Sequence, residues 1–240
     1  MATPSDKYHR TYHLPWSPGA SSDDKVLRSV GHLIGREVVI TEKLDGENNG
    51  MTGEEQGYYA RSHGGMPTHP SNNEGKVLHA RVRHILDPNL TVFGEYCCAV
   101  HSIRYNLGLP SYFSVFGVRD DVTKTWWAWD DVVLMAHVLD LPTVPVLWRG
   151  IVKDEAALKN LTDRFCLDQA SVYGEARPDG TFEMRPDGVT IGQREGVVVK
   201  YTGTYTDAST AMGKWVRAGH VATDVHWRSK PVERQPLNLG

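Results

Sequence analysis

Hydrophobic residues along this chain follow two periods, one typical of strands and one typical of helices. Short β-branched or aromatic runs predict strands at 36–44, 56–62, 91–98, 112–119, 143–148 and 195–201. Apolar residues at i, i+3 and i+4 predict helices from Ser22-Asp23-Asp24 through Leu33, from Asp130-Asp131 through Leu139, and from Asp154 through about Cys166. Residues 75–86 also have helical spacing. This irregular order of elements predicts an α+β fold with largely antiparallel sheets packed against helices.

One domain accounts for this pattern. A chain of 240 residues, 40% of them hydrophobic, can bury a sizeable core. We divide it into an N-terminal segment and helix at 1–35, a core at 36–217 and a C-terminal tail at 218–240. No hydrophobic run is long enough to cross a bilayer, and the N-terminus lacks the basic-then-apolar pattern of a signal peptide. The sequence therefore predicts a soluble protein with no membrane partner.

Cysteine usage indicates the compartment. The chain has three cysteines, the adjacent Cys97 and Cys98 and the distant Cys166. This arrangement gives neither a disulfide framework nor the spacing of a zinc site. Free thiols persist in a reducing environment, so we expect the protein to be cytoplasmic.

The overall charge of −3 is unusual for a protein that binds nucleic acid, because phosphate contacts normally require a basic face. Any such face must therefore be local. The segment 75–86 contains Lys76, Arg81 and Arg83 and no acid. From Lys200 onward the chain carries six Lys or Arg against three acids. Both segments are candidates for contact with nucleic acid, and a merely solvated face is the alternative for each.

A lysine beside acids and a glycine is the clearest sign of chemistry. Residues 42–48 read Glu-Lys-Leu-Asp-Gly-Glu-Asn and follow the β-type run 38–41. With an ordinary pKa of about 10.4, Lys43 would be protonated at neutral pH, so burial, nearby cations or a bound nucleotide with its metal must depress that pKa before the amine can attack. Asp45 would position the amine, and Gly46 would let the backbone approach a phosphate or sugar. Alone, this stretch also fits a strand that ends in a solvated turn.

Further segments that end in charged or aromatic residues follow in order, at 59–64, 92–96, 112–118, 195–201 and 214–217. With the K-x-D-G that begins at Lys43, this order resembles the covalent nucleotidyltransferase superfamily of polynucleotide ligases and mRNA capping enzymes. It is most similar to ATP-dependent RNA ligases of the RNA ligase 2 type, from about Glu42 to Arg217. DNA ligases and capping enzymes usually carry arginine where this chain has Asn48, so Asn48 favours an RNA ligase.

The resemblance implies a nucleotidyltransferase domain of two largely antiparallel sheets flanked by helices, with the nucleotide between the sheets. It implies that the Nζ of Lys43 attacks the α-phosphate of ATP, releases pyrophosphate and forms a lysyl-AMP intermediate. The AMP would then pass to an RNA 5′-phosphate, and an RNA 3′-hydroxyl would displace it, as in RNA repair. All three steps are phosphoryl transfers, which need Mg²⁺ or Mn²⁺ for charge neutralisation.

The resemblance also implies roles for acidic and polar residues. Glu95 would bind the ribose hydroxyls or a metal ion, and Glu195 would bind a metal ion. Glu42 and Asn48 would line the nucleotide pocket. Arg61 would contact the ribose or a phosphate of the incoming strand. The alternative for the two strand-end acids is simple solvation.

One aromatic ring and several cations complete the expected site. Phe116 would stack on adenine, whereas Phe113 would follow the commoner fate of an aromatic strand residue and pack in the core. Lys200 and Lys214 would face the α-phosphate, where the transition state gathers charge. Longer RNA ligases carry K-x-K in the last segment, so here the second lysine is missing or is replaced by Arg217. Gly117 stands where an aspartate commonly follows the stacking aromatic.

Only 23 residues follow Arg217, which is too few for the oligonucleotide-binding barrel of DNA ligases and capping enzymes or for the helical C-terminal domain of longer RNA ligases. We therefore expect either help from an RNA-binding subunit or an end-processing kinase or phosphatase, or an unusually competent single domain. Two alternatives stay open. One is a minimal DNA ligase or GTP-dependent capping-type nucleotidyltransferase, and the other is a catalytically silent nucleotide- or RNA-binding module.

Overall fold

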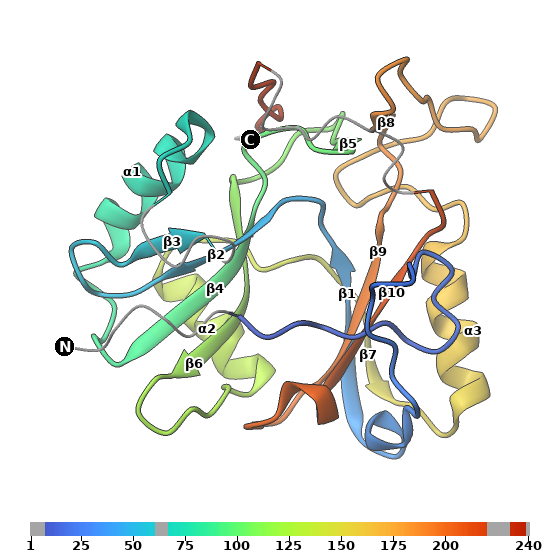
Figure 1. Ribbon diagram of the computed structural model, residues 1–240, viewed down its shortest axis with the longest axis horizontal. Helices are drawn as coiled ribbons and strands as arrows, with labels where there is room; N and C mark the ends of the chain where they lie inside the picture. The colour runs from blue at the N-terminus through green and yellow to red at the C-terminus, as the bar shows by residue number, and fades with distance from the viewer. Residues whose placement is uncertain (1–7, 61–66, 220–230, 239–240) are drawn as a thin grey trace.

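The computed structural model describes residues 8–60, 67–219 and 231–238. Two four-stranded sheets stand side by side (Figure 1). The first has the order β10 (Met212–Val216), β9 (Gly196–Tyr201), β1 (Glu37–Lys43) and β7 (Val146–Ile151). The second has the order β3 (Tyr58–Ala60), β2 (Glu47–Met51), β4 (Leu90–Tyr96) and β6 (Phe113–Asp120). Every neighbouring pair in both sheets is antiparallel, as predicted.

In the described part of the chain, α-helices cover one face of each sheet. The helices α1 (Asn73–Val82) and α2 (Trp129–Val138) lie against the second sheet, and α3 (Glu155–Cys166) lies against the first (Figure 1). The short elements are η1 (Gly31–Leu33), η2 (Pro70–Asn72), η3 (Ala208–Thr210) and the parallel pair of β5 (Ile103–Arg104) with β8 (Thr190–Ile191). The predicted α+β class is confirmed. None of the described helices is long and apolar enough to cross a membrane.

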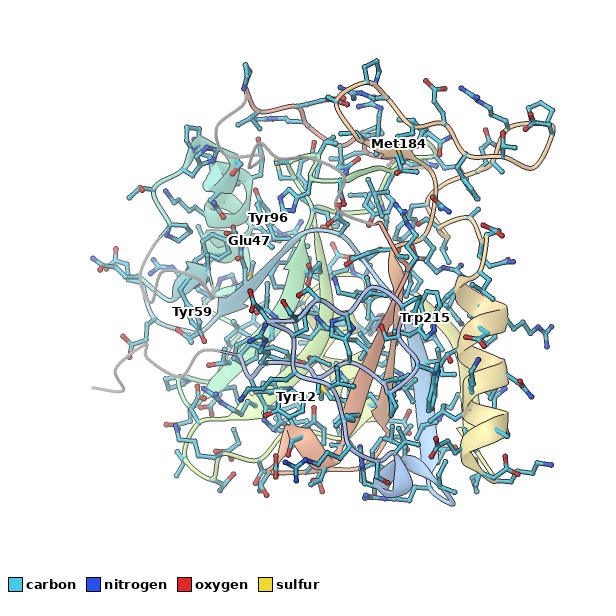
Figure 2. All side chains as sticks on the ribbon, turned by 45° about the vertical axis from the view of Figure 1, so that its right-hand side comes forward. Tyr12, Glu47, Tyr59, Tyr96, Met184 and Trp215 are labelled. Carbon is cyan, nitrogen blue, oxygen red and sulfur yellow. The ribbon has the colours of Figure 1, made fainter. Side chains whose placement is uncertain are left out.

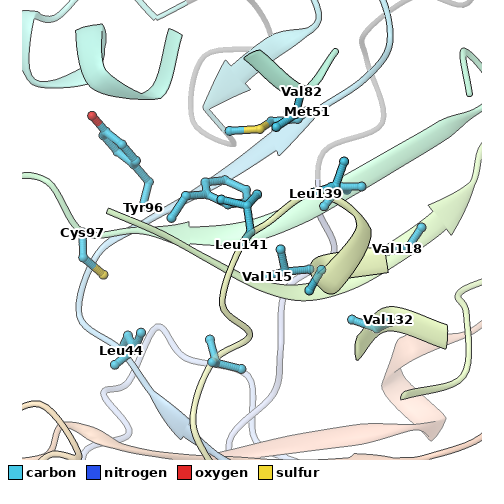
Figure 3. Packing of buried hydrophobic residues seen from close by; sticks show 14 of the residues in the cluster. Leu44, Met51, Val82, Tyr96, Cys97, Val115, Val118, Val132, Leu139 and Leu141 are labelled. Carbon is cyan, nitrogen blue, oxygen red and sulfur yellow. The ribbon is translucent and has the colours of Figure 1, made fainter. Parts of the chain in front are cut away.

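Each sheet has its own hydrophobic core. Figure 3 shows part of the core of the second sheet, where Met51 from β2, Val115 from β6 and Leu139 after α2 pack together. In the first sheet, Trp215 of β10 is 1% exposed and lies on the side of α3 (Figure 2). Burying one such side chain stabilises the fold by roughly 1.5–3 kcal/mol, and Val39 of β1 belongs to the core of the second sheet, so the two sheets also pack on each other.

The chain crosses directly from the first sheet to the second. The strand β1 ends at Lys43 and β2 begins at Glu47, so the crossing is only residues 44–46. The side chain of Leu44 is 2% exposed and anchors this crossing in the core. Residues near Lys43 therefore lie between the two sheets.

The predicted helix at 22–33 is wrong, because only its last turn is helical, as η1. The carboxylate of Asp24 accepts a hydrogen bond from the backbone N–H of Ser21 at 3.1 Å, which forms a turn instead of a helix cap. The N–H of Leu27 donates to the carbonyl of His13 at 2.8 Å, so this segment runs beside the preceding one. Its apolar residues are buried against the first sheet by an irregular path, at Leu27, Val30 and Leu33.

The prediction omits β2 and β10, and it treats residues 218–240 as a tail. The strand β2 reads Glu-Asn-Asn-Gly-Met, a composition with little intrinsic preference for strands, and its pairing with β3 and β4 compensates. The described residues 231–238 are part of the domain. The buried amide of Gln235 accepts from the N–H of Tyr105 at 2.9 Å and donates to the carbonyl of Ile103 at 2.6 Å.

Candidate active site

A cavity of about 460 Å³ lies between the two sheets. The first sheet contributes Thr41, Glu42, Lys43, Val198, Lys200 and Lys214. The second sheet contributes Asn48, Glu95 and Phe116. Strands far apart in the sequence thus bring together most of the candidate residues in one cleft.

The ammonium of Lys43 contacts the carboxylate of Glu195. The Nζ lies 2.7 Å from each carboxylate oxygen. Antiparallel pairing of β1 with β9 sets Lys43 opposite Gly196, so the last residue of one strand meets the acid just before the other. The Glu195 side chain is 4% exposed and that of Lys43 is 26% exposed. The amine is therefore open to the cleft while its acidic partner is sealed beneath it.

Several carboxylates act on this one lysine. Burial lowers the pKa of Lys43, but Glu195, Glu95 and Asp45 raise it more, and the pKa lies above its usual value. Burial raises the pKa of Glu95 to about 7 and that of Glu195 to about 7, against the attraction of Lys43. The carboxylates therefore outweigh burial, and the pKa of the lysine is not depressed in the chain alone, as one of the sequence alternatives held. Release of its proton requires added positive charge at these carboxylates.

Gly46 serves a close approach between strands. Its N–H donates to Oε1 of Glu95 at 3.1 Å. A Cβ at this position would lie 2.6 Å from the carbonyl oxygen of Tyr96 and 2.6 Å from the Sγ of Cys97. The glycine is therefore needed for contact with the end of β4, and it also lines the cleft, where the approach to a phosphate or sugar stays a prediction.

Asp45 fastens the crossing between the sheets. Its Oδ2 accepts hydrogen bonds from the backbone N–H and the hydroxyl of Ser102, at 2.7 and 2.9 Å, and from the N–H of Ile103 at 2.9 Å. Its own N–H donates to the hydroxyl of Tyr105 at 2.7 Å. Asp45 also influences Lys43 by charge, and these hydrogen bonds hold the loop that follows the lysine.

A β-bulge separates the two candidate aromatic rings. The register between β4 and β6 shifts between Phe93 and Gly94, which makes Phe116 an extra residue on β6. Bulges redirect side chains and are common next to active sites. Phe113 is fully buried in the core of the second sheet, whereas Phe116 is partly exposed and lines the cleft. Of the two rings, Phe116 is the one available to a ligand.

Gly117 follows the bulge and faces a tryptophan. A Cβ on Gly117 would lie 3.3 Å from the ring of Trp126. The ring of Trp126 thus packs close to the backbone of Gly117 and leaves little room for the aspartate that is common at this position.

Lys200 is a buried cation with one strong contact. Its Nζ donates to the carbonyl of Phe116 and lies 5.8 Å from the centroid of that ring and 5.3 Å from that of Trp129. Burial lowers the pKa of Lys200 to about 7. No carboxylate of the described residues pairs with it. An anion bound in the cleft would therefore raise the pKa of Lys200 again and favour its charged form, which burial disfavours.

The two cations of the last segment have different positions. The Nζ of Lys214 lines the cleft and lies 4.0 Å from the carboxylate of Asp24. The side chain of Arg217 instead donates to Oγ1 of Thr190 at 3.2 Å, and it is not among the residues that line the cleft. Its backbone N–H donates to the carbonyl of Glu195 at 3.0 Å. Arg217 therefore supports the position of Glu195.

Of the three remaining predicted residues, two line the cleft and one lies outside the described part of the chain. Glu42 lines the cleft, but its carboxylate accepts from the N–H of Val172 at 2.8 Å and lies 3.4 Å from the Nε of Arg194. Asn48 lines the cleft on β2, in register with Glu95. Arg61 lies outside the described residues.

The sequence interpretation did not include the N-terminal segment in the site. Residues 8–14 cross from one sheet to the other (Figure 1), and three of them line the cleft. At one end the ring of Tyr8 lies 5.0 Å from that of Phe116, and at the other the N–H of Lys214 donates to the carbonyl of Tyr12 at 2.9 Å. Tyr8, Arg10, Thr11 and Asp24 line the cleft. No local pattern marks these residues, because only their packing brings them there.

Two carboxylates at the site suit a divalent cation, Glu95 in the lining of the cleft and Glu195 buried beneath Lys43. Glu95 and Glu195 offer hard oxygen ligands, and burial, with a smaller contribution from neighbouring carboxylates, raises the pKa of each. In the ranges 8–60, 67–219 and 231–238, no three His, Cys, Asp or Glu side chains group as a metal site. Mg²⁺ commonly takes one or two carboxylates and completes its shell with waters and substrate phosphates, so the two acids fit such an ion.

Comparisons with known proteins give a consistent result. The model of the RNA ligase family matches residues 36–216. No curated protein sequence matches the chain. The fold is similar to that of an archaeal ATP-dependent RNA ligase solved in two forms, with TM-scores of 0.52 and 0.53 and 16% identity in each. Each alignment covers 89% of this chain and 49% of the archaeal chain, so this chain spans about half the length of that protein.

Proposed function

This chain belongs to the RNA ligase family, and we propose that it is an ATP-dependent RNA ligase that works through a lysyl-AMP on Lys43. The observation that carries the proposal is the position of the Lys43 amine, exposed to the cleft and 2.7 Å from the buried Glu195. A lysine held in this way by an acid, beside further cations, suits nucleophilic attack on a polyphosphate.

Lys43 must lose a proton before its Nζ attacks the α-phosphate, and a second proton as the N–P bond forms. Glu195, in contact with that amine, would accept the first proton once added positive charge in the cleft has lowered the pKa of Lys43, and the leaving pyrophosphate would take the second. Pyrophosphate leaves as the new bond forms, and AMP stays on Lys43. The position of the attacking amine and an acceptor for its proton thus both come from Lys43 and Glu195, which the fold places in contact.

Lys200 and Lys214 would supply charge to the transferring phosphate. Both line the cleft, and burial lowers the pKa of each, so each gains from an anionic neighbour. Phe116 and Tyr8 would bound the space for the base. When bound by Glu95 and Glu195, Mg²⁺ or Mn²⁺ would neutralise charge on the phosphates.

The same cleft would serve the two later steps. AMP would pass from Lys43 to an RNA 5′-phosphate, and an RNA 3′-hydroxyl would then displace it and join the strands, as in RNA repair. An RNA-binding subunit or an end-processing kinase or phosphatase would act beside this chain. We also propose a cytoplasmic setting, which the three free, buried cysteines support.

Labelling with ATP tests this function. Wild-type protein incubated with α-labelled ATP and Mg²⁺ should acquire a covalent, acid-labile and base-stable adduct typical of a phosphoramidate. Lys43→Ala should abolish this adduct, because it removes the nucleophile. Lys153→Ala, which changes an exposed lysine far from the cleft, is the matched control and should label normally.

Persistence of the label in Lys43→Ala would disprove the assignment of the nucleophile. Preferential labelling by GTP would instead indicate a capping-type enzyme. An adduct that passes to DNA ends but not to RNA ends would indicate a DNA ligase.

A further inference from the structure

Arg10 is a cation of the cleft that has no part in the steps described so far. Among the described residues that line the cleft it is the one arginine, beside the three lysines Lys43, Lys200 and Lys214. A guanidinium presents a planar fork of N–H donors that can bind two phosphate oxygens at once, whereas an ammonium acts as a point charge. Arg10 is therefore a candidate for binding part of a polyphosphate.

The segment that carries Arg10 is fixed on both sides of it (Figure 1). Two residues after Arg10, the carbonyl of Tyr12 accepts a hydrogen bond from the N–H of Lys214 in β10 at 2.9 Å. Two residues before it, the ring of Tyr8 lies 5.0 Å from that of Phe116 in β6. Arg10 thus lies between two anchored points, one on each sheet, and its side chain has a defined place at the cleft.

A single carboxylate oxygen joins Arg10 to Lys214. The Nη2 of Arg10 lies 3.3 Å from Oδ1 of Asp24, and the Nζ of Lys214 lies 4.0 Å from the same atom. The other oxygen, Oδ2, accepts hydrogen bonds from the N–H and the hydroxyl of Ser21, at 3.1 and 2.9 Å. Burial raises the pKa of Asp24, but the hydrogen bonds from Ser21 and the charges of Lys214 and His13 lower it to about 2, so the carboxylate is ionised at neutral pH. One anionic oxygen therefore lies between two cations of the cleft.

This geometry suits a chain of phosphates. Because both cations contact one oxygen atom, they are close enough to bind neighbouring phosphates of the same polyphosphate. Lys214 is also close enough to Lys43 and Glu195 for their charges to shift its pKa, which places it near the attacking amine. The phosphate that Lys43 attacks would therefore lie at Lys214, and the next phosphates would lie at Arg10.

A purely structural role for Arg10 is the alternative. Its guanidinium also donates to the carbonyl of Asp23 at 3.1 Å, so it could simply fasten the N-terminal segment to the turn at 21–24. The side chain of Arg10 is 46% exposed, however, and ion pairs open to solvent contribute little to stability. A bound anion can therefore displace Asp24 from Arg10 at little cost.

We propose that Arg10 binds the β- and γ-phosphates of ATP, which leave as pyrophosphate, and that Asp24 holds Arg10 and Lys214 until ATP takes its place. The inference rests on the proposed function, in which Lys43 attacks the α-phosphate. The guanidinium stabilises the charge that gathers on the leaving pyrophosphate, as the N–P bond forms and the bond from the α-phosphorus to the bridging oxygen breaks. AMP lacks both of these phosphates, so Arg10 should distinguish ATP from AMP.

Calorimetric binding of ATP and of AMP in the presence of Mg²⁺ tests the proposal. Lys43→Ala is the background of every protein compared, because no covalent adduct should form there. In that background Arg10→Gln should raise the Kd for ATP at least about tenfold and the Kd for AMP less than about twofold, because only ATP offers the phosphates that the charge-assisted hydrogen bonds would bind. Arg10→Lys keeps the charge but not the fork of donors, so its Kd for ATP should lie between the two.

The matched control is Arg28→Gln, which changes an exposed arginine of the same N-terminal segment outside the lining of the cleft. It should leave both Kd values unchanged. Unchanged ATP affinity in Arg10→Gln would overturn the inference. Equal losses for ATP and AMP would overturn it as well, because Arg10 would then only hold the segment that lines the cleft. If wild-type protein binds ATP without forming a lysyl-AMP, while Arg10→Gln weakens binding of ATP alone, the proposed function fails and the phosphate site at Arg10 stands.

Discussion

At Glu95 the fold opposes the ionisation of a carboxyl group that the proposed reaction uses. Burial and the nearby Glu195 raise its pKa from 4.5 to about 7, and Lys43 offsets only part of this. Three carboxylates near one ammonium leave an excess of negative charge, which a metal ion and phosphates can balance. Residues that suit catalysis here therefore lower the stability of the unliganded chain.

This conflict predicts a pH-dependent effect of Glu95→Gln. Because the pKa of Glu95 is higher in the folded than in the unfolded chain, the folded chain binds more protons between pH 4.5 and about 7, and the free energy of unfolding falls as pH rises through that window. At pH 8 the variant should be more stable than wild type by about 1–3 kcal/mol. At pH 4.5 or below the difference should approach zero. Urea unfolding at both pH values measures it.

Glu54→Gln is the control, since Glu54 is exposed and lies outside the cleft. It should change the free energy of unfolding little at either pH. A stabilisation by Glu95→Gln that is equal at both pH values would show that ionisation of Glu95 is not its cause.

At the scale of elements, the start of α3 is set by a single side chain. The carboxylate of Asp154 accepts a hydrogen bond from the N–H of Ala157 at 2.7 Å and so caps the helix. The sequence predicted this start, because an acid precedes apolar residues at i, i+3 and i+4. By contrast, Asp24 has similar neighbours but binds Ser21 in a turn. A residue that can cap a helix therefore predicts one only where the apolar residues after it can pack against the sheet as a single helical face.

We expect Asp154→Ala to lower the free energy of unfolding by about 1 kcal/mol, because an unsatisfied N–H is left in the first turn of α3. The midpoint of urea unfolding should fall while its slope stays unchanged. Adenylylation by the folded fraction should be unaffected, since Asp154 does not line the cleft. Asp154→Asn keeps an acceptor and should lose much less stability. If Asp154→Asn lowered the free energy of unfolding as much as Asp154→Ala does, the stabilisation would come from the negative charge of Asp154 and not from its hydrogen bond to the helix.

At the scale of the whole molecule, the proposed adenylylation and the proposed sealing place different requirements on the protein. Adenylylation needs only ATP, which the cleft can enclose, whereas sealing also needs RNA held by surface cations. Screening by salt weakens exposed phosphate contacts far more than contacts in a buried cleft. The two activities should therefore respond differently to the same change in solution.

Sealing of ends with a 3′-hydroxyl and a 5′-phosphate should fall steeply between low and moderate salt, while adenylylation falls less. RNA ends should be sealed better than all-DNA ends of the same sequence, because a 2′-hydroxyl is available for recognition only in RNA. Parallel assays of adduct formation and sealing at each salt concentration measure both effects. Parallel losses in the two assays, or equal sealing of RNA and DNA, would contradict this division.

Local patterns predicted the helices α2 and α3 and most strands, because their apolar periods match the faces they bury. They did not predict β2, whose polar residues Asn48 and Asn49 form a strand only between two neighbours. They also did not predict the path of residues 22–33, where tertiary contacts with the N-terminal segment replace helical hydrogen bonds. Strand pairing and packing are non-local, so a single segment carries little information about them.

The sequence by itself determined the candidate chemistry, because the order of Lys43, Glu95, Glu195, Lys200 and Lys214 is a property of the chain. Only the tertiary structure decided how those residues act together. Strand register brings Lys43 to Glu195, and a bulge turns Phe116 into the cleft. Packing of the N-terminal segment across the two sheets brings Tyr8 and Arg10 to the cleft. Charges that are distant in sequence shift one another's pKa only when folding sets them a few ångströms apart in a poorly solvated place.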